Sequence, residues 1–540
     1  MVVSEAVGRA LASEGVRVVF GLIGSGNLAV TNALRDAGAR FVAARHETGA
    51  VCMADGYARV SGEVGCASVH QGPGLTNAIT GLTEAAKSRT PVVLVAADTP
   101  ASALRSNFKI DQDGLVESVG AVAERVHGAD TAVADAVRAV RRARVERRAV
   151  VLMLALDVQA METDGGAAAA ALEVASPRPD DAAVARIAEA LADARRPAII
   201  AGRGAVLAGA GSALRRLGEL TGAVLATSAV ANGLFAGDPS DVGIAGGFAT
   251  PSATRLLRDA DVVLAVGASL NAWTTRHGTM FGPDAKVIQV DVDAEAIGAH
   301  RPVDLGAIGD ARLTAEALVA ALDRSRADAG RSGRIAAGRW RDEPYEETTA
   351  ADVLDPRTLS IALDDLLPIE RTVVVDSGHF MGWPSMYLRV PDAAGFVFPQ
   401  AFQCVGLALG NAIGAAVARP DRLTVAALGD GGALLSLPEL ETLGRLGLPI
   451  LVIVYNDAAY GAEVHHFRPM GHAVDVAQFP DTDFAALARA AGSEGITARR
   501  IADLEPLRAW LERRDGPMVL DAKVDPDICA DWLEEAFRGH

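Results

Sequence analysis

The sequence predicts an α/β protein of three doubly wound domains, each built on a parallel β-sheet. Short, Val-rich apolar segments alternate with Ala-rich helical patterns along the chain, as expected for parallel strands that helices cover on both faces. The length of 540 residues exceeds what one hydrophobic core usually holds. Two stretches without periodicity, 163–181 and 324–356, separate three blocks of similar size, so we read them as linkers.

The predicted elements follow the same order in each block. The first block, 1–162, opens with an amphipathic helical pattern, MVVSEAVGRALASEG, and continues with strands expected at 16–21, 40–44, 64–70 and 92–97. The central block, 183–324, begins with the strand pattern RPAIIAG. The third block, 355–540, starts with RTVVVDSG and ends near DGPMVLDAKVDPD.

Composition narrows the class of protein. Half of the residues are apolar and 22% are charged, which is typical of a folded globular protein. The net charge of −17 has the wrong sign for a surface that binds nucleic acid or an anionic membrane, and no apolar run reaches the roughly 20 residues of a spanning helix. The four scattered cysteines and the lack of a signal-peptide pattern fit a reducing cytoplasm. We expect a cytoplasmic enzyme for small molecules, without nucleic-acid or membrane partners.

A glycine motif follows the first predicted strand. The segment GSGNLA at 24–29 has the GxGxxA spacing of a dinucleotide-binding turn, and a second strand ends near Glu47. The same glycines also suit a tight strand-to-helix turn without a ligand. This motif therefore leaves NAD binding, a plain turn and another use of the turn open.

Acidic residues and glycines follow two predicted strands of the third block. A strand at 423–428 precedes Gly429, Asp430, Gly431 and Gly432, with a helix expected from about Leu437, and a strand at 449–455 leads to Asp457 in NDAAYG. Both motifs lie at carboxyl ends of strands, where open α/β sheets bind ligands. Magnesium takes about six oxygens, commonly from one or two carboxylates and substrate phosphates. The pattern predicts a magnesium and diphosphate site.

These motifs resemble the thiamine diphosphate fingerprint of the acetolactate synthase and 2-oxo acid decarboxylase superfamily. RHETGAVCMADGYAR at 45–59, HQGPGLTNAITGL at 70–82 and FGPDAKVIQVDVDAEAIG at 281–298 also resemble segments of that family, and the similarity spans essentially the whole chain. The resemblance implies thiamine diphosphate and Mg²⁺ as cofactors, with small 2-oxo acids, aldehydes or ketones as substrates.

The resemblance also implies roles for single residues. Glu47 would hydrogen-bond the cofactor's pyrimidine ring and activate it, while Asp430 and Asp457 by side chain and Ala459 by its carbonyl would bind magnesium. Val405 would hold the cofactor in its bent shape. The remaining contacts to the cofactor would come from Gly378, His379, Gly429, Gly431, Gly432, Tyr460 and Gly461. In this superfamily two chains share each active site, so a homodimer is the expected minimum unit and a homotetramer stays open.

At three places the sequence differs from acetohydroxyacid synthases, and these differences bear on the type of reaction. The segment GASLNAWTTRHG lacks the stretch that contacts FAD in acetohydroxyacid synthases, so we expect no FAD. AEVHHF follows Gly461 where those enzymes carry a Gln–Trp pair, and its two His would lie where a mobile helix closes the pocket. Asp457 stands where the usual residue is Asn.

Other residues expected in the pocket resemble those of a different enzyme of the superfamily. Ser25 and His70 resemble the active-site serine and histidine of benzoylformate decarboxylase, and Gln112 is a further pocket candidate. The leading prediction is an acetolactate synthase-like decarboxylase and carboligase, and the alternative is a benzoylformate decarboxylase-like or aldehyde lyase-like enzyme. A catalytically silent or NAD-binding protein is a third possibility, against which Glu47 and Asp430 argue.

Overall fold

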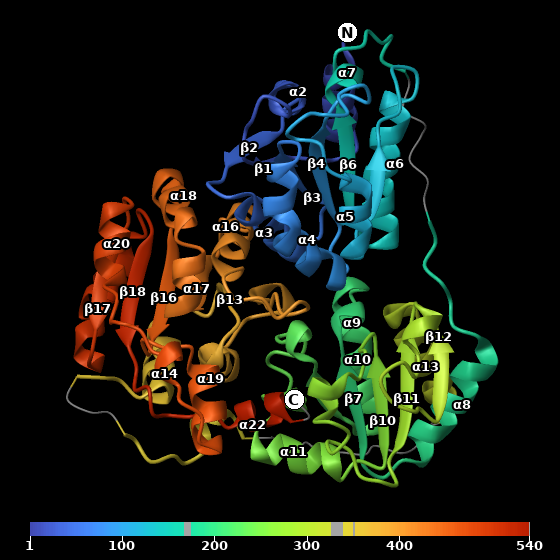
Figure 1. Ribbon diagram of the computed structural model, residues 1–540. Helices are drawn as coiled ribbons and strands as arrows, with labels where there is room; N and C mark the ends of the chain where they lie inside the picture. The colour runs from blue at the N-terminus through green and yellow to red at the C-terminus, as the bar shows by residue number, and fades with distance from the viewer. Residues whose placement is uncertain (167–173, 326–337, 349–351, 539–540) are drawn as a thin grey trace.

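The protein contains three six-stranded sheets, and all of their strand pairs are parallel. The computed structural model describes residues 1–166, 174–325, 338–348 and 352–538. Figure 1 shows the sheets in three separate regions, the first in blue and cyan, the central one in green and yellow, and the third in orange and red. The predicted α/β fold is confirmed. The sheets lie inside the three predicted ranges, while the domain limits remain predictions.

The first sheet has the strand order β2-β1-β3-β4-β6-β5. Neighbouring residues of one strand, such as Leu94 and Val95, belong to different apolar clusters, so side chains pack on both faces of the sheet. The strands are β1 (Val18–Gly21), β2 (Arg40–Ala43), β3 (Gly65–Val69), β4 (Val92–Asp98), β5 (Val122–Arg125) and β6 (Ala149–Ala155). The helices are α1 (Val3–Ser13), α2 (Leu28–Asp36), α3 (Glu47–Ser61), α4 (Pro73–Lys87), α5 (Gln112–Ser118), α6 (Ala132–Glu146) and α7 (Leu156–Gln159).

The central sheet has the order β12-β11-β10-β7-β8-β9. Its strands are β7 (Pro197–Ala201), β8 (Val224–Thr227), β9 (Asp241–Ile244), β10 (Val262–Val266), β11 (Lys286–Asp291) and β12 (Leu305–Ile308). Its helices are α8 (Asp181–Asp193), α9 (Arg203–Leu207), α10 (Gly211–Thr221), α11 (Pro251–Arg258), α12 (Ala272–Thr275) and α13 (Ala311–Ser325).

The third sheet has the order β14-β13-β15-β16-β18-β17. Its strands are β13 (Arg371–Val375), β14 (Phe396–Val397), β15 (Leu423–Gly429), β16 (Ile450–Asn456), β17 (Glu494–Ala498) and β18 (Met518–Lys523). Its helices are α14 (Pro356–Leu366), α15 (Gly382–Tyr387), α16 (Ala408–Ala418), α17 (Asp430–Leu435), α18 (Pro438–Leu446), α19 (Gly461–Phe467), α20 (Phe484–Ala490), α21 (Glu505–Arg513) and α22 (Trp532–Phe537). The helix expected from about Leu437 is confirmed as α18, which begins at Pro438, while the short helix α17 that begins at Asp430 was not predicted.

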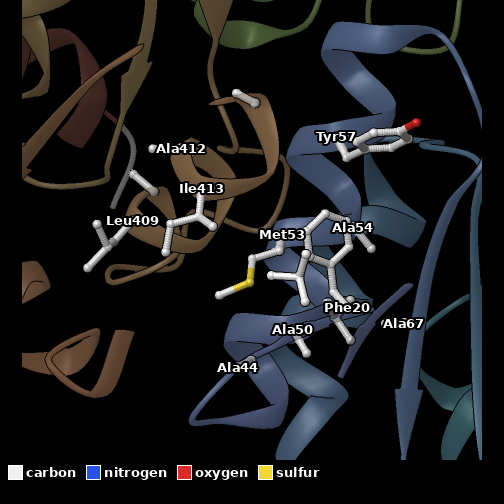
Figure 2. Packing of buried hydrophobic residues seen from close by; sticks show 14 of the residues in the cluster. Phe20, Ala44, Ala50, Met53, Ala54, Tyr57, Ala67, Leu409, Ala412 and Ile413 are labelled. Atoms are coloured by element: carbon white, nitrogen blue, oxygen red, sulfur yellow. The ribbon is translucent and has the colours of Figure 1, made fainter. Parts of the chain in front are cut away.

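One apolar core joins the first and third domains. Met53 of α3 points toward Leu409 and Ile413 of α16 in Figure 2. The two helices approach so closely that a Cβ added at Gly414 would overlap the Met53 carbonyl oxygen. Because α3 begins at Glu47 and the loop before α16 carries Val405, this packing fixes two predicted site segments relative to each other.

Two other observations bear on the class of protein. Within the described ranges, no helix has both the length and the apolar character needed to cross a membrane. The four cysteines are free thiols, as their scattered positions predicted.

Candidate active site

Two carboxyl groups meet at the carboxyl edge of the third sheet. Asp430 begins α17 directly after β15, Asp457 directly follows β16, and Gly429 pairs with Tyr455 where these strands lie side by side. The two Asp side chains are hydrogen-bonded to each other. Burial raises the pKa of Asp430 to about 6, and burial together with the charge of Asp430 raises the pKa of Asp457 to about 8.

This pair has the chemistry of a divalent cation site. A hydrogen bond between two carboxyl groups needs a shared proton, and a cation can take the place of that proton. Asp457 Oδ1 also accepts a hydrogen bond from Ala459 N at 3.2 Å, across Ala458 with its positive φ of 55°. No group of three metal-ligating side chains occurs in the described ranges, so further ligands would have to be backbone, cofactor or water oxygens, as the predicted set requires.

Glycines beside the carboxyl pair allow side chains of the site to pack closely against the backbone. A Cβ at Gly431 would lie 2.7 Å from the Tyr460 ring, and one at Gly432 would overlap the Asp376 carboxylate. At Gly461, a Cβ would lie 2.5 Å from Asp457 Oδ2. Larger residues at these positions would therefore displace the Tyr460 ring or the carboxylates of Asp376 and Asp457.

A cavity of about 1680 Å³ collects the predicted cofactor-binding residues. It runs from the Asp pair to the central domain, where it reaches the loops after β7, β10 and β11. Every residue predicted to bind the cofactor or metal lines it, namely Gly378, His379, Val405, Gly429, Asp430, Gly431, Gly432, Asp457, Ala459, Tyr460 and Gly461.

His379 is held in a neutral form at the wall of this cavity. Its side chain is buried, and its Nε2 accepts a hydrogen bond from Ala530 N at 2.8 Å. Burial, with a smaller effect of His465 beside it, lowers the pKa of His379 to about 3. The ring centroids of the two histidines lie 4.4 Å apart. His379 thus presents an uncharged ring and anchors the segment before α22.

Glu47, His70 and Ser25 gather at the carboxyl edge of the first sheet. Glu47 is 8% exposed, and its Oε2 accepts a hydrogen bond from Asn77 Nδ2 at 3.1 Å. His70 Nδ1 accepts from Gly26 N at 3.2 Å, which leaves the ring proton on Nε2. Burial lowers the pKa of His70, and the charge of nearby Glu47 partly opposes this shift. Ser25 is exposed in the same turn.

The glycines of the GxGxxA motif allow the side chains after β3 to pack against the turn after β1. A Cβ at Gly24 would lie 2.8 Å from the His70 ring, and one at Gly26 would overlap the Gln71 side chain. The glycines therefore make room for protein side chains at this turn. Of the three uses that the sequence left open, the structure supports a turn that seats His70.

Both polar atoms of the Gln112 carboxamide form hydrogen bonds with the backbone. Its carboxamide oxygen accepts from Gly72 N at 3.0 Å, and its nitrogen donates to Ala97 O at 3.1 Å. The residue is 2% exposed. These bonds support the Gly72 turn next to His70, and a substrate contact of Gln112 stays a prediction.

Sequence reasoning missed three polar residues at the carboxyl edges of the first and third sheets. Asn77 hydrogen-bonds Glu47, Asp376 accepts backbone N–H groups of Gly406 and Leu407 beside Val405, and Glu439 accepts those of Arg45 and His46 before Glu47. Asn77 and Asp376 lie inside motifs that were recognised, so their position in those motifs was the available signal. Glu439 gave none, since its contacts are long-range.

The two edges remain separate within one chain. The described lining of the large cavity contains neither Glu47 nor His70 nor Ser25. The first domain thus supplies a Glu–His–Ser cluster, and the third domain supplies the carboxyl pair and the glycines that the sequence predicts to hold a metal and a diphosphate.

Comparison with known proteins agrees with both halves of the site. Three thiamine pyrophosphate enzyme models match the chain, the N-terminal TPP-binding domain over 1–119, the central domain over 184–318 and the C-terminal TPP-binding domain over 376–522. The sulfoacetaldehyde acetyltransferase of Castellaniella defragrans is 30% identical, with an alignment covering 100% of this chain and 95% of that protein.

Two further similarities broaden the range of relatives. A probable acetolactate synthase large subunit of Methanocaldococcus jannaschii is 26% identical, with 97% of this chain and 92% of that protein aligned. The fold matches that of a thiamine diphosphate-dependent 4-hydroxybenzoylformate decarboxylase of Rhodococcus jostii with a TM-score of 0.84, at 23% identity and over 98% and 100% of the two chains. The sequence matches, supported by the geometry of the two edges, show that the chain belongs to the family of thiamine pyrophosphate enzymes.

Proposed function

We propose that this protein uses thiamine diphosphate and Mg²⁺ to decarboxylate a 2-oxo acid and to transfer the acyl unit to a carbonyl acceptor, in the manner of acetolactate synthase. The observation that carries the proposal is the hydrogen-bonded pair of Asp430 and Asp457, in one cavity with the glycine cradle and Val405. The full-length similarity to sulfoacetaldehyde acetyltransferases supports acyl transfer. When bound, the cofactor supplies a nucleophilic carbon and an electron sink.

The chain's own residues divide the remaining tasks. Asp430, Asp457 and the Ala459 carbonyl would hold Mg²⁺, and the cation would neutralise the diphosphate. Val405 would support the bent cofactor. Glu47, kept in place by Asn77, would accept a hydrogen bond from the pyrimidine ring. His70, with its ring proton on Nε2, is suited to move a proton at the substrate.

We also propose that the working unit is at least a homodimer, with each site formed between two chains. Glu47 does not border the cavity that would hold the cofactor in its own chain. Large apolar side chains are exposed beside both edges, Ile23 and Phe108 in the first domain and Leu435 and Tyr460 in the third. Joining the edges of two chains would cover these side chains and bring Glu47 to a cofactor.

A specific observation also favours a second candidate, a benzoylformate decarboxylase-like enzyme. His70 is neutral near pH 7 because burial lowers its pKa, and Gly26 N fixes its tautomer. The Nε2–H can therefore hydrogen-bond a 2-oxo acid, and the ring, once protonated by solvent, would deliver the proton that release of an aldehyde requires. Carboligation does not need that proton, because the acceptor carbonyl captures the acyl unit.

Product analysis separates the two candidates. Purified protein would be incubated with thiamine diphosphate, Mg²⁺ and a panel of 2-oxo acids and sulfoacetaldehyde, with and without carbonyl acceptors, and CO₂, aldehyde and acyloin would be measured. We expect acyloin or acyl transfer to dominate, full loss of turnover with chelator, and no flavin absorbance. Aldehyde as the sole product would favour the second candidate, and turnover without cofactor would contradict both.

A further inference from the structure

Gln403 has a backbone conformation that its residue type rarely adopts. Its φ is 57°, in the left-handed region, where Gly is at ease and Asn or Asp is tolerated. It lies two residues before Val405, on the wall of the large cavity. Residues in such sparsely populated conformations persist where the surrounding structure fixes them, and they cluster at functional sites.

Two buried carboxylates fix the loop on either side of Gln403. Phe402 N donates to Glu84 Oε2 at 2.7 Å, and Gly406 N donates to Asp376 Oδ2 at 2.9 Å. Glu84 is 1% exposed and is itself held by Arg59 Nη2 at 2.8 Å. The loop is thus tied to the first domain on one side and to the end of β13 on the other. This double attachment explains how a Gln is kept at positive φ.

The side chain of Gln403 is available to a ligand. Gln403 is exposed, and its carboxamide makes no hydrogen bond within the described ranges. It borders the same cavity as Gln400, Val405 and the pair of Asp430 and Asp457. A carboxamide offers two N–H donors and one acceptor oxygen, a combination that suits the carboxylate and carbonyl oxygens of a 2-oxo acid.

We propose that Gln403 is a specificity-determining residue whose carboxamide hydrogen-bonds the 2-oxo acid substrate. This proposal rests on the proposed function and adds one contact to it. Gly would adopt this positive φ without strain. The strained backbone at Gln403 is therefore accepted because it places a long polar side chain at this position. The buried clamp of Glu84 and Asp376 serves to hold that side chain at the cavity wall.

Three variants of Gln403 test the proposal. Gln403→Gly removes the carboxamide and relieves the backbone, Gln403→Ala removes the carboxamide and keeps the strain, and Gln403→Asn keeps a carboxamide in a residue that tolerates positive φ. Because hydrogen bonds to a charged group are among the stronger ones, kcat/KM for the preferred 2-oxo acid should fall about 10- to 100-fold in the Gly and Ala variants. The Asn variant should recover part of this loss.

Two readouts besides activity separate this role from others. Titration of thiamine diphosphate with Mg²⁺ should give the same affinity in all variants, and the Tm of Gln403→Gly should not fall. Arg514→Gly is the matched control, because Arg514 also has a positive φ of 46° but is exposed at the end of α21. Its kcat/KM should equal that of the wild type.

The opposite results overturn the proposal. A loss of cofactor affinity parallel to the loss of kcat/KM would make Gln403 a cofactor contact, and unchanged kcat/KM in the Gly variant would leave it without a role in substrate binding. A wild-type chain that turns over no 2-oxo acid would instead contradict the proposed function. Calorimetric titration with pyruvate would then decide whether Gln403 affects binding of the acid, and equal affinity in wild type and Gln403→Gly would refute its role.

Discussion

At the scale of single residues, the chemistry of the proposed metal site depends on Asp457. With Asn at this position, Asp430 would face a neutral amide, whereas here two carboxyl groups face each other in a buried place. Like charges at this separation disfavour each other, so the pair keeps a proton well above the ordinary carboxyl range near pH 4. The extra charge strengthens attraction to Mg²⁺ and opposes the diphosphate, and these two effects partly offset each other.

Because the pair retains a proton, we predict that the stability of the metal-free protein depends on pH. The pKa values of Asp430 and Asp457, about 6 and about 8 in the folded metal-free protein, exceed the unfolded value near 4. The folded state therefore binds more protons than the unfolded state in that window, and the metal-free protein loses stability as pH rises from about 4 to about 8. We expect the Tm difference between Mg²⁺- and chelator-treated protein to widen from pH 5 to pH 8. A difference that stays constant or narrows would contradict this.

Substitutions of the pair should give unequal results. Asp430→Ala removes one of two ligand carboxylates, so Mg²⁺-dependent binding of thiamine diphosphate should be lost. Asp457→Asn keeps an oxygen donor and removes the like charge, so binding and activity should persist while the pH dependence of the Tm difference becomes shallower. Calorimetry and thermal melts measure both. Equal, complete loss in the two variants would show that Asp457 is needed as a charge.

Glu47 should matter for turnover and not for cofactor affinity. Glu47→Gln keeps the side chain's shape and its contact with Asn77 but removes the carboxylate that would take part in proton transfer. Positioned proton transfer is typically worth about 10²- to 10⁴-fold in rate, so kcat should fall by about that factor while thiamine diphosphate still binds. Glu63→Gln, on an exposed carboxylate just beyond the end of α3, is the control and should leave kcat unchanged. Wild-type kcat in Glu47→Gln would remove this residue from the mechanism.

At the scale of elements, local patterns predicted about half of the strands, and the resemblance to a known family supplied most of the candidate cofactor-site residues, whose roles remain predictions. The six strands expected with explicit limits in the first and third domains lie within two residues of the observed ones. The candidate site residues could be named because they stand in short motifs that resemble segments of the family. The short helix α17 was missed, since Gly431 and Gly432 favour a turn in isolation. The glycine contacts between α3 and α16 were missed because they join residues more than 350 positions apart.

Those glycine contacts predict a large effect of a small side chain. A Cβ at Gly414 would overlap the Met53 carbonyl oxygen, in a helix pair that cannot shift without moving the first domain against the third. Gly414→Ala should therefore cost about 1–3 kcal/mol of the free energy of unfolding and lower the Tm. Gly128→Ala is the control, because nothing lies within 4 Å of its added Cβ. Equal Tm values would mean that the helices can separate freely.

At the scale of the whole molecule, the arrangement of domains keeps the two groups of candidate site residues apart within one chain. The core shared by α3 and α16 fixes the first domain to the third in one chain, yet Glu47 does not border the large cavity. Figure 1 shows the same arrangement, with the first domain packed on α16 while the central domain and α22 lie at the other end of the third domain. Each chain therefore carries one half of a site at the edge of its first sheet and the other half at the edge of its third sheet. A second copy of the chain could complete both halves.

The divided site predicts complementation between two inactive variants. In a dimer with shared sites, one Glu47→Gln chain and one Asp430→Ala chain form one site with both defects and one site with none. Coexpression in equal amounts makes half of the dimers mixed, so activity should recover to about a quarter of the wild-type value. Two different affinity tags allow the mixed dimer to be isolated, and its activity should be about half of the wild-type value. Isolated mixed dimers without activity above that of the two parents would show that each chain builds its site alone.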